Sequence, residues 1–137
     1  MPRYLLDTDH ISFLQRGDER VMQRYETETS DQVAASIVSY EEQLKGRLAV
    51  VSQAKPEGLE LAYYRLQEMQ EFFCLLNVVG FDRNARLQFL ELKKQYRRLG
   101  TMDLRIAATA LSLDLILVTR NRKDFEQIEE LKIESWA

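Results

Sequence analysis

The stretch "YLLDTDHISFLQRG", from Tyr4 to Gly17, decides how the chain is organised. The apolar run from Tyr4 to Leu6 predicts a short buried strand, and this strand stops at an acid, Asp7. A second acid, Asp9, follows, and the apolar spacing after it predicts a helix that ends before Gly17. Two carboxylates therefore flank Thr8 where a strand passes into a helix. Such a place suits either a helix cap or a ligand site.

Strands and helices alternate along the rest of the chain. Apolar, β-branched runs predict further strands at 33–38, 74–81, 114–119 and 131–136. Helical spacing predicts helices at 18–28, 39–54, 59–73 and 83–99, the last closed by Gly100, and another that begins near Asp103. Alternation of this kind implies parallel pairing through helical crossovers, and so an α/β sheet covered on both faces. The 137 residues show no linker and predict a single domain, 1–137.

Composition narrows the class of protein. The net charge of −3 argues weakly against a nucleic-acid coat protein but allows nucleic-acid chemistry. No segment approaches the roughly 18 apolar residues of a membrane span, and the N-terminus has no signal-peptide pattern. The single cysteine, Cys74, lies in an apolar run and is predicted to be a core residue in a reducing compartment. We therefore expect a cytoplasmic protein.

Polar residues follow the predicted strands in an ordered way. In open parallel sheets, the carboxyl ends of the strands form the edge where ligands bind. Residues expected at this edge are Asp7 after the first strand, Glu41 and Glu42 after the second, Asn121 and Asp124 after strand 114–119, and Asp103 at the start of the preceding helix. Taken singly, each also suits an ordinary cap, turn or exposed position. Asp9 is the better helix cap of the first two acids, and Asp82 is predicted to cap helix 83–99.

Converging carboxylates repel one another, and they tolerate proximity when a divalent cation lies among them. Mg²⁺ and Mn²⁺ prefer such hard oxygen ligands, and they support hydrolysis of phosphodiesters through an activated water. No cluster of cysteine and histidine suits zinc, and no glycine-rich phosphate loop is present. The only histidine, His10, is predicted to be a surface or packing residue.

Four blocks of the sequence resemble the PIN domains, and closely the VapC-type toxins of bacterial toxin–antitoxin systems. They are "YLLDTDHIS", "SIVSYEEQLKG", "GTMDLRIAATALSLDLILVTRNRKDF" and the ending "LKIESW". The resemblance implies a three-layer α/β/α sandwich with a mainly parallel central sheet. It implies an endoribonuclease that depends on Mg²⁺ or Mn²⁺. It also implies a VapB-like antitoxin partner and a homodimer. Apolar residues on the early helices, Phe13, Leu14 and Tyr63, are candidates for such interfaces, and packing in the core is the alternative for each.

The same resemblance assigns roles to individual residues. Asp7, Glu42 and Asp103 match the family's acidic metal ligands, with Glu41 a weaker match than Glu42. Asn121 stands where the family often has a fourth aspartate, so the number of metal ions stays open. Thr8 and Asp124 are expected to support these groups. From their charge and position, rather than from the resemblance, Arg120 and Arg122 are expected to hold RNA phosphate.

Two alternatives remain at this point. A haloacid-dehalogenase-like phosphatase would use Asp7 as nucleophile and Asp9 as general acid, but the expected downstream lysine and acidic pair match poorly. A catalytically inactive PIN-like module would act only by binding protein, and the retained acids argue against it. Which RNA is cut is not contained in the sequence.

Overall fold

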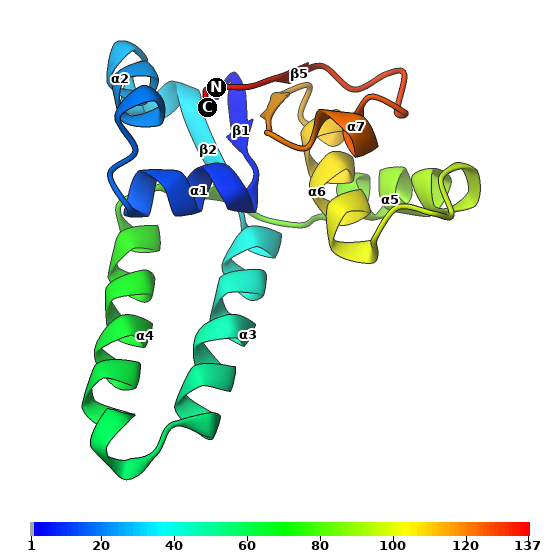
Figure 1. Cartoon of the computed structure of the whole chain (residues 1–137). Coiled ribbons are helices and arrows are strands. Elements are labelled where there is room, and N and C mark those ends of the chain that lie inside the picture. Colours follow the sequence, from blue (N-terminus) through cyan, green and yellow to red (C-terminus); the bar gives the residue numbers. More distant parts are fainter. Residues whose placement is uncertain (1) are drawn as a thin grey trace.

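The computed structural model describes residues 2–137 and contains one parallel sheet (Figure 1). Its five strands lie in the order β3-β2-β1-β4-β5, and each neighbouring pair is parallel. The strands are β1 (Tyr4–Leu6), β2 (Val33–Ser36), β3 (Asn77–Val79), β4 (Ile116–Val118) and β5 (Ile133–Glu134). The predicted α/β fold with a mainly parallel sheet is confirmed.

Helices connect the strands and cover both faces of the sheet. They are α1 (Thr8–Gln15), α2 (Glu19–Thr27), α3 (Ile37–Gln53), α4 (Leu59–Cys74), α5 (Arg83–Gln95), α6 (Thr101–Ser112) and the short α7 (Arg122–Phe125). Two 3₁₀ turns, Ser30–Gln32 and Pro56–Gly58, complete the connections. Among residues 2–137, no helix combines the length and the apolar character needed to cross a membrane.

Two apolar clusters form the two sides of the sandwich. Leu5, Ala34 and Leu117 point to one face, where they pack with α5 and α6. Leu6 and Ala35 point to the other face, where they pack with α1, α2 and α4. Alternate residues of each strand thus enter opposite clusters, as the period of two in a strand requires. Because the strands are buried on both faces, they read as continuous apolar runs in the sequence.

The strand order places a switch point beside the central strand. From β1 the chain first builds β2 and β3 on one side, and it then crosses to build β4 and β5 on the other. The carboxyl ends of β1 and β4 therefore lie next to each other, and the Asp7 N–H donates to the Val118 carbonyl at 3.0 Å. Ligands in open parallel sheets bind at this kind of place.

Several predicted boundaries were wrong, each for a local reason. The second strand ends at Ser36 rather than at Val38, because the Ser36 side chain accepts from the Val38 N–H and caps α3. Gly100 does not close α5, which ends at Gln95, and instead caps α6. Cys74 ends α4 and is exposed, so the predicted core position was wrong.

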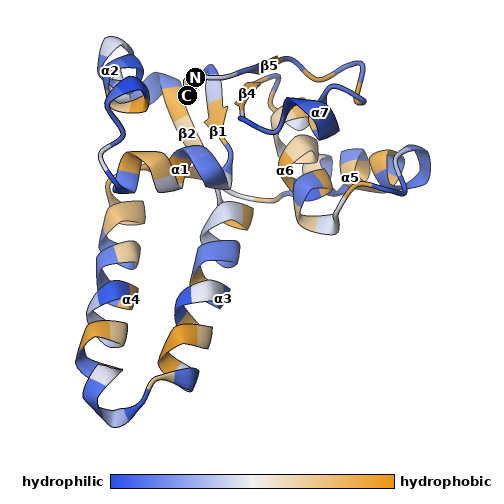
Figure 2. Cartoon of the chain, viewed as in Figure 1, coloured by the Kyte–Doolittle hydropathy of each residue, from blue (hydrophilic) through white to orange (hydrophobic). Residues whose placement is uncertain are grey.

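Helices α3 and α4 extend together away from the sheet (Figure 1). Near the sheet they pack through an edge-to-face pair of Tyr40 and Phe73, with ring centroids 5.1 Å apart. Farther out, apolar side chains remain exposed, and Figure 2 shows orange segments on the outer part of both helices. We call this set the apolar arm; it consists of Leu48, Val50, Leu59, Leu61, Tyr63 and Tyr64.

Candidate active site

The first helix begins at the strand end because Asp7 caps it. The carboxylate Oδ1 of Asp7 accepts from the backbone N–H of His10 at 2.8 Å, while its backbone remains extended. The expectation that Asp9 is the better cap was therefore wrong: Asp9 lies in the first turn of α1. Asp7 caps the helix and also belongs to the site, because its side chain is 8% exposed and lines a cavity.

A small cavity at the carboxyl edge of the sheet brings the predicted residues together. It has a volume of about 80 Å³. Its lining residues are Asp7, Thr8, Asp9, Glu42, Asp103, Ile106, Asn121 and Phe125, which come from α1, α3, α6 and the chain after β4. A larger hollow of about 460 Å³ lies between α1, α3 and α4, but Asp7, Glu42 and Asp103 do not line it. The smaller cavity is the candidate site because carboxylate oxygens, which can bind a cation, line it; its volume plays no part in the choice.

Thr8 connects α1 to α3 inside this cavity. Its hydroxyl donates to Glu42 Oε1 at 2.7 Å and lies 3.0 Å from the Ser39 hydroxyl oxygen. Ser39 is completely buried and stands one turn before Glu42 on α3. The sequence interpretation missed Ser39, although its spacing of three residues from Glu42 places both on one face of a helix.

The structure also separates the two neighbouring glutamates of α3. Glu42 faces the cavity, whereas Glu41 pairs with Lys45 at 3.3 Å on the exposed side of the helix. Only Glu42 therefore has the position that a site acid requires.

Asn121 and Asp124 meet just after β4. The Asn121 side-chain amide donates to Asp124 Oδ2 at 3.0 Å, and the Asn121 backbone N–H donates to the Thr119 hydroxyl at 2.9 Å. Asp124 thus holds the asparagine that lines the cavity. Asp124 itself is not part of the lining, where Asp9 stands as the carboxylate beside Asp7, Glu42 and Asp103.

The ionised form of Asp103 is disfavoured by its surroundings. Burial raises the pKa of Asp103 above its ordinary value of 3.8, and the neighbouring charges of Glu42, Asp124, Asp7 and Asp9 raise it further. Among residues 2–137, no lysine or arginine forms an ion pair with any of these five acids. The cavity therefore collects negative charge that the protein does not neutralise with a basic side chain.

Comparison with known proteins identifies the family of the chain. Residues 4–131 match the family model of the PIN domain. The chain belongs to the PIN-domain family. It is 30% identical over 139 residues to Ribonuclease VapC1 of Haemophilus influenzae strain R2866, with 98% of each chain covered. It is 28% identical over 142 residues to the tRNA(fMet)-specific endonuclease VapC of Salmonella typhimurium, with 100% of each covered.

A solved structure of VapBC-1 from nontypeable Haemophilus influenzae contains a similar chain. Its TM-score is 0.72 at 27% identity, and 97% of each chain is covered. The expected family and fold of the chain are thereby confirmed.

The donors of this PIN domain suit Mg²⁺ or Mn²⁺ in kind, because they are hard oxygens with excess negative charge. Among residues 2–137, no three Asp, Glu, His or Cys side chains are arranged so as to hold a metal ion as they stand. Mg²⁺ sites in proteins usually combine one or two carboxylates with waters and substrate phosphate, rather than a complete protein cage. Asp7, Glu42 and Asp103 therefore fit as candidate ligands, and their role stays a prediction.

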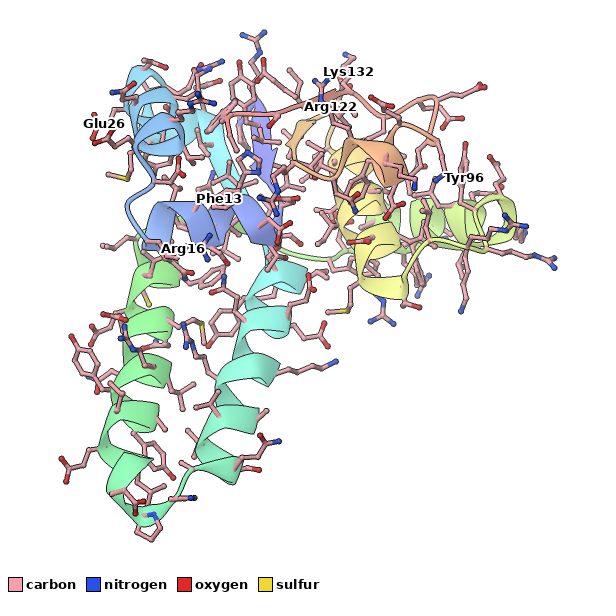
Figure 3. The ribbon with its side chains drawn as sticks, viewed as in Figure 1. Phe13, Arg16, Glu26, Tyr96, Arg122 and Lys132 are labelled. Atoms are coloured by element: carbon pink, nitrogen blue, oxygen red, sulfur yellow. The ribbon has the colours of Figure 1, made fainter. Side chains whose placement is uncertain are left out.

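Neither of the two predicted phosphate-binding arginines is part of the lining of the cavity. Arg120 is exposed, and its guanidinium carbon lies 5.2 Å from the ring centre of Phe13. Arg16 stacks on the same ring, also at 5.2 Å. Arg122 begins α7 and is exposed, and Figure 3 labels it there, apart from Phe13 on α1 and Arg16 at the end of α1.

The histidine of this PIN domain is not a surface residue. His10 is completely buried, which agrees with the packing alternative of the sequence analysis. Its Nδ1 lies 3.2 Å from Asp7 Oδ1, and the Trp136 backbone N–H donates to its Nε2 at 3.2 Å. The sequence pattern could not reveal this contact, because Trp136 is 126 residues away along the chain.

Proposed function

We propose that the chain is a divalent-metal-dependent endoribonuclease that acts as the toxin of a toxin–antitoxin pair. The observation that carries this proposal is the cavity where Asp7, Glu42 and Asp103 meet, with no lysine or arginine among residues 2–137 paired to them. Membership of the PIN-domain family and likeness to VapC ribonucleases support it. The substrate proposed first is a transfer RNA, because one relative is named a tRNA(fMet)-specific endonuclease.

The roles of the side chains follow from their positions. Asp7 and Asp103 hold Mg²⁺ or Mn²⁺, together with Glu42, whose orientation Thr8 fixes through its 2.7 Å hydrogen bond. A bound Mg²⁺ or Mn²⁺ supplies Lewis-acid stabilisation of phosphate charge and makes an attacking water more acidic. Asn121 adds an uncharged amide, so it can orient a water or a phosphate without raising the ligand charge. Arg120 directly precedes Asn121, which lines the cavity, and its charge favours a phosphate of the substrate there.

We further propose two protein partners. A VapB-like antitoxin fits because the Haemophilus structure is a VapBC complex. A homodimer fits because the apolar arm exposes large side chains, including Tyr63 at 57%. Of the three interface candidates named from the sequence, Leu14 is buried and is therefore a core residue, whereas Phe13 is partly buried against its own cluster. Tyr63 is exposed and remains a candidate.

The phosphatase alternative is not favoured. Its scheme needs a lysine near the two aspartates, and the lining of the cavity contains none. The family match is to the PIN domain. An inactive binding module is not favoured either, because the acids converge on one cavity.

The test compares the wild type with Asp7→Asn in an inducible bacterial growth assay in which cellular RNA ends are mapped. Asparagine can still cap α1, so the fold should survive while a carboxylate is lost. Asp82→Asn is the matched control, because Asp82 caps α5 in the same way, outside the site. Growth arrest and new RNA ends in the wild type and the control, but not in Asp7→Asn, are expected. Equal arrest in all three would refute the assignment of Asp7.

Cleavage of purified transfer RNA then tests the metal. Addition of EDTA should abolish cleavage, and Mg²⁺ or Mn²⁺ in excess should restore it. Cleavage that persists in EDTA would contradict the metal dependence while leaving the nuclease assignment intact.

A further inference from the structure

His10 lies between a candidate catalytic acid and the end of the chain. We propose that His10 is a positioning residue that holds Asp7 in place through a neutral imidazole protonated on Nδ1. The inference rests on the proposed function in one respect, namely that Asp7 is a metal ligand. The arrangement of hydrogen bonds itself is independent of any activity.

The hydrogen bonds of the ring determine its tautomer. A backbone N–H can only donate, so the bond from Trp136 to Nε2 requires an unprotonated Nε2. A neutral ring then carries its proton on Nδ1, which lies 3.2 Å from Asp7 Oδ1 and donates to it. Among residues 2–137, no buried side-chain nitrogen or oxygen lacks a partner, so both ring nitrogens are satisfied in this arrangement.

The donor to Nε2 is held by contacts of its own. The Trp136 indole donates to Glu134 Oε2 at 2.9 Å, and its ring packs edge-to-face on Tyr4 at 5.3 Å. Strand β5, which contains Glu134, pairs with β4. The Trp136 N–H is therefore fixed by the sheet and its packing, and it selects the tautomer of His10 rather than adapting to it.

The consequence for Asp7 is that its two oxygens differ. Oδ1 accepts from both the backbone N–H and Nδ1 of His10. Oδ2 accepts no hydrogen bond from residues 2–137, and no buried side-chain oxygen in that range lacks a partner, so Oδ2 is open to the cavity. His10 thus holds the carboxylate of Asp7 through Oδ1 and leaves Oδ2 free to bind a cation in the cavity. In many metal sites, a carboxylate that binds the metal is oriented by a hydrogen bond from a neighbouring group, which is the role proposed here for His10.

The first measurement uses the fact that the chain has a single histidine. Selective ¹⁵N labelling of histidine gives one pair of ring signals, which report the tautomer directly. At neutral pH, in metal-free wild type, Nδ1 should have the shift of a protonated nitrogen and Nε2 that of an unprotonated acceptor. The opposite tautomer, a rapidly exchanging mixture or a doubly protonated ring would overturn the inference. This readout requires neither nuclease activity nor metal.

Two variants then separate the ring's two contacts. Asparagine places an amide where Nδ1 stands and can still donate to Asp7, whereas glutamine places its amide where Nε2 stands and cannot. His10→Gln should weaken Mn²⁺ binding, measured by titration, by about tenfold or more, as loss of a ligand's hydrogen-bond partner typically does. His10→Asn should rescue most of that loss, although it loses the contact to Trp136. Thermal unfolding of both variants accounts for any general loss of stability.

The outcomes distinguish this inference from the proposed function. Mn²⁺ binding by His10→Gln as tight as that of the wild type would overturn the positioning role, as would His10→Asn binding no better than His10→Gln. If the wild type neither binds Mn²⁺ nor cleaves RNA, the proposed function fails and with it the role of Asp7 as a ligand. If His10→Gln does not fold, the tautomer of the wild type still decides for or against the hydrogen-bond arrangement.

Discussion

The cavity at the carboxyl edge and the apolar arm depart from ordinary protein structure in opposite ways. At the edge, Asp103 is held near four other carboxylates although burial and repulsion both oppose its charge. On the arm, Leu61 and Tyr64 are 59% and 60% exposed although burial would stabilise them. The first region concentrates charge that repels, and the second leaves apolar surface in water.

The two regions differ in the kind of partner that would stabilise them. Negative charges that meet without a basic partner gain stability from a cation, whereas exposed apolar side chains gain it from a protein surface. The edge is held by the sheet, by the Asp7 cap and by the Thr8 bond, so it keeps its shape without the cation. The outer arm consists of two packed helices and the 3₁₀ turn that joins them, and its exposed apolar surface is available to a partner.

The largest expected effect is at Asp103. Asp103→Asn should lower RNA cleavage by about 100-fold or more, because it removes an electrostatic group from the site. The same change should stabilise the metal-free protein by about 0.5–2 kcal/mol, since it relieves repulsion at a functional site. Urea unfolding in EDTA measures the second effect, with Asp82→Asn as control. A destabilised but active variant would contradict the view that charge was concentrated there for function.

The arm is tested by its effect on association. Tyr63→Arg should convert a dimer to a monomer, because it places a charge in an apolar contact. Light scattering at micromolar concentration measures the mass, and Gln127→Arg, an exposed position after α7, makes the same change of charge elsewhere. A wild type that is already monomeric would count against the dimer, and a Tyr63→Arg dimer would move the interface to another surface.

An intermediate effect is expected at Thr8. Thr8→Val keeps the shape of the side chain but removes the hydroxyl that orients Glu42. Cleavage should fall about tenfold, with a smaller change in substrate affinity, as for loss of a group that orients a ligand. Thr27→Val removes an exposed hydroxyl at the end of α2 and should leave cleavage unchanged. No change in Thr8→Val would show that Glu42 needs no support.

A smaller effect is expected at Arg120. In an Asp7→Asn background, which prevents cleavage, Arg120→Ala should weaken RNA binding severalfold. It should also lower the slope of log affinity against log salt by about 0.7 to 0.9, the value for one phosphate contact. Lys132→Ala is the control, because Lys132 pairs with Asp114 before the amino ends of β4 and β5. An unchanged salt slope in Arg120→Ala would exclude the phosphate contact.

The smallest effect concerns pH in the metal-free protein. A carboxyl whose pKa is raised on folding stabilises the fold when protonated, and this contribution is lost as pH rises through the raised value. The stability of the wild type relative to Asp103→Asn should therefore fall as pH rises from the ordinary value of 3.8 toward neutrality. Urea unfolding in EDTA at several pH values measures it. A constant difference between the two proteins would show that Asp103 is not strained.

Much of the site was predictable from the sequence because its parts follow strands. Asp7 comes directly after β1, and Asn121 follows β4 by a few residues, so the rule for parallel sheets places them together. The sequence alone was a weaker guide to whether Glu41 or Glu42 faces the site. Neighbouring residues on a helix point in different directions, and the packing of the helix decides which of them faces the sheet. Ser39 was missed because a serine on a helix has no distinctive pattern.

The apolar runs by themselves determined a parallel α/β sheet, and the order of polar residues after them determined where the acids collect. These properties are local, because they depend on periodicity and on the residue that ends each strand. The cap of α1 by Asp7 rather than Asp9 is local as well, since Asp7 accepts from the N–H of His10, three residues on. Tertiary structure alone decided that Cys74 is exposed and that His10 meets Trp136. The physical reason is that exposure and long-range hydrogen bonds depend on which distant surfaces come together, and the chain separates His10 from Trp136 by 126 residues.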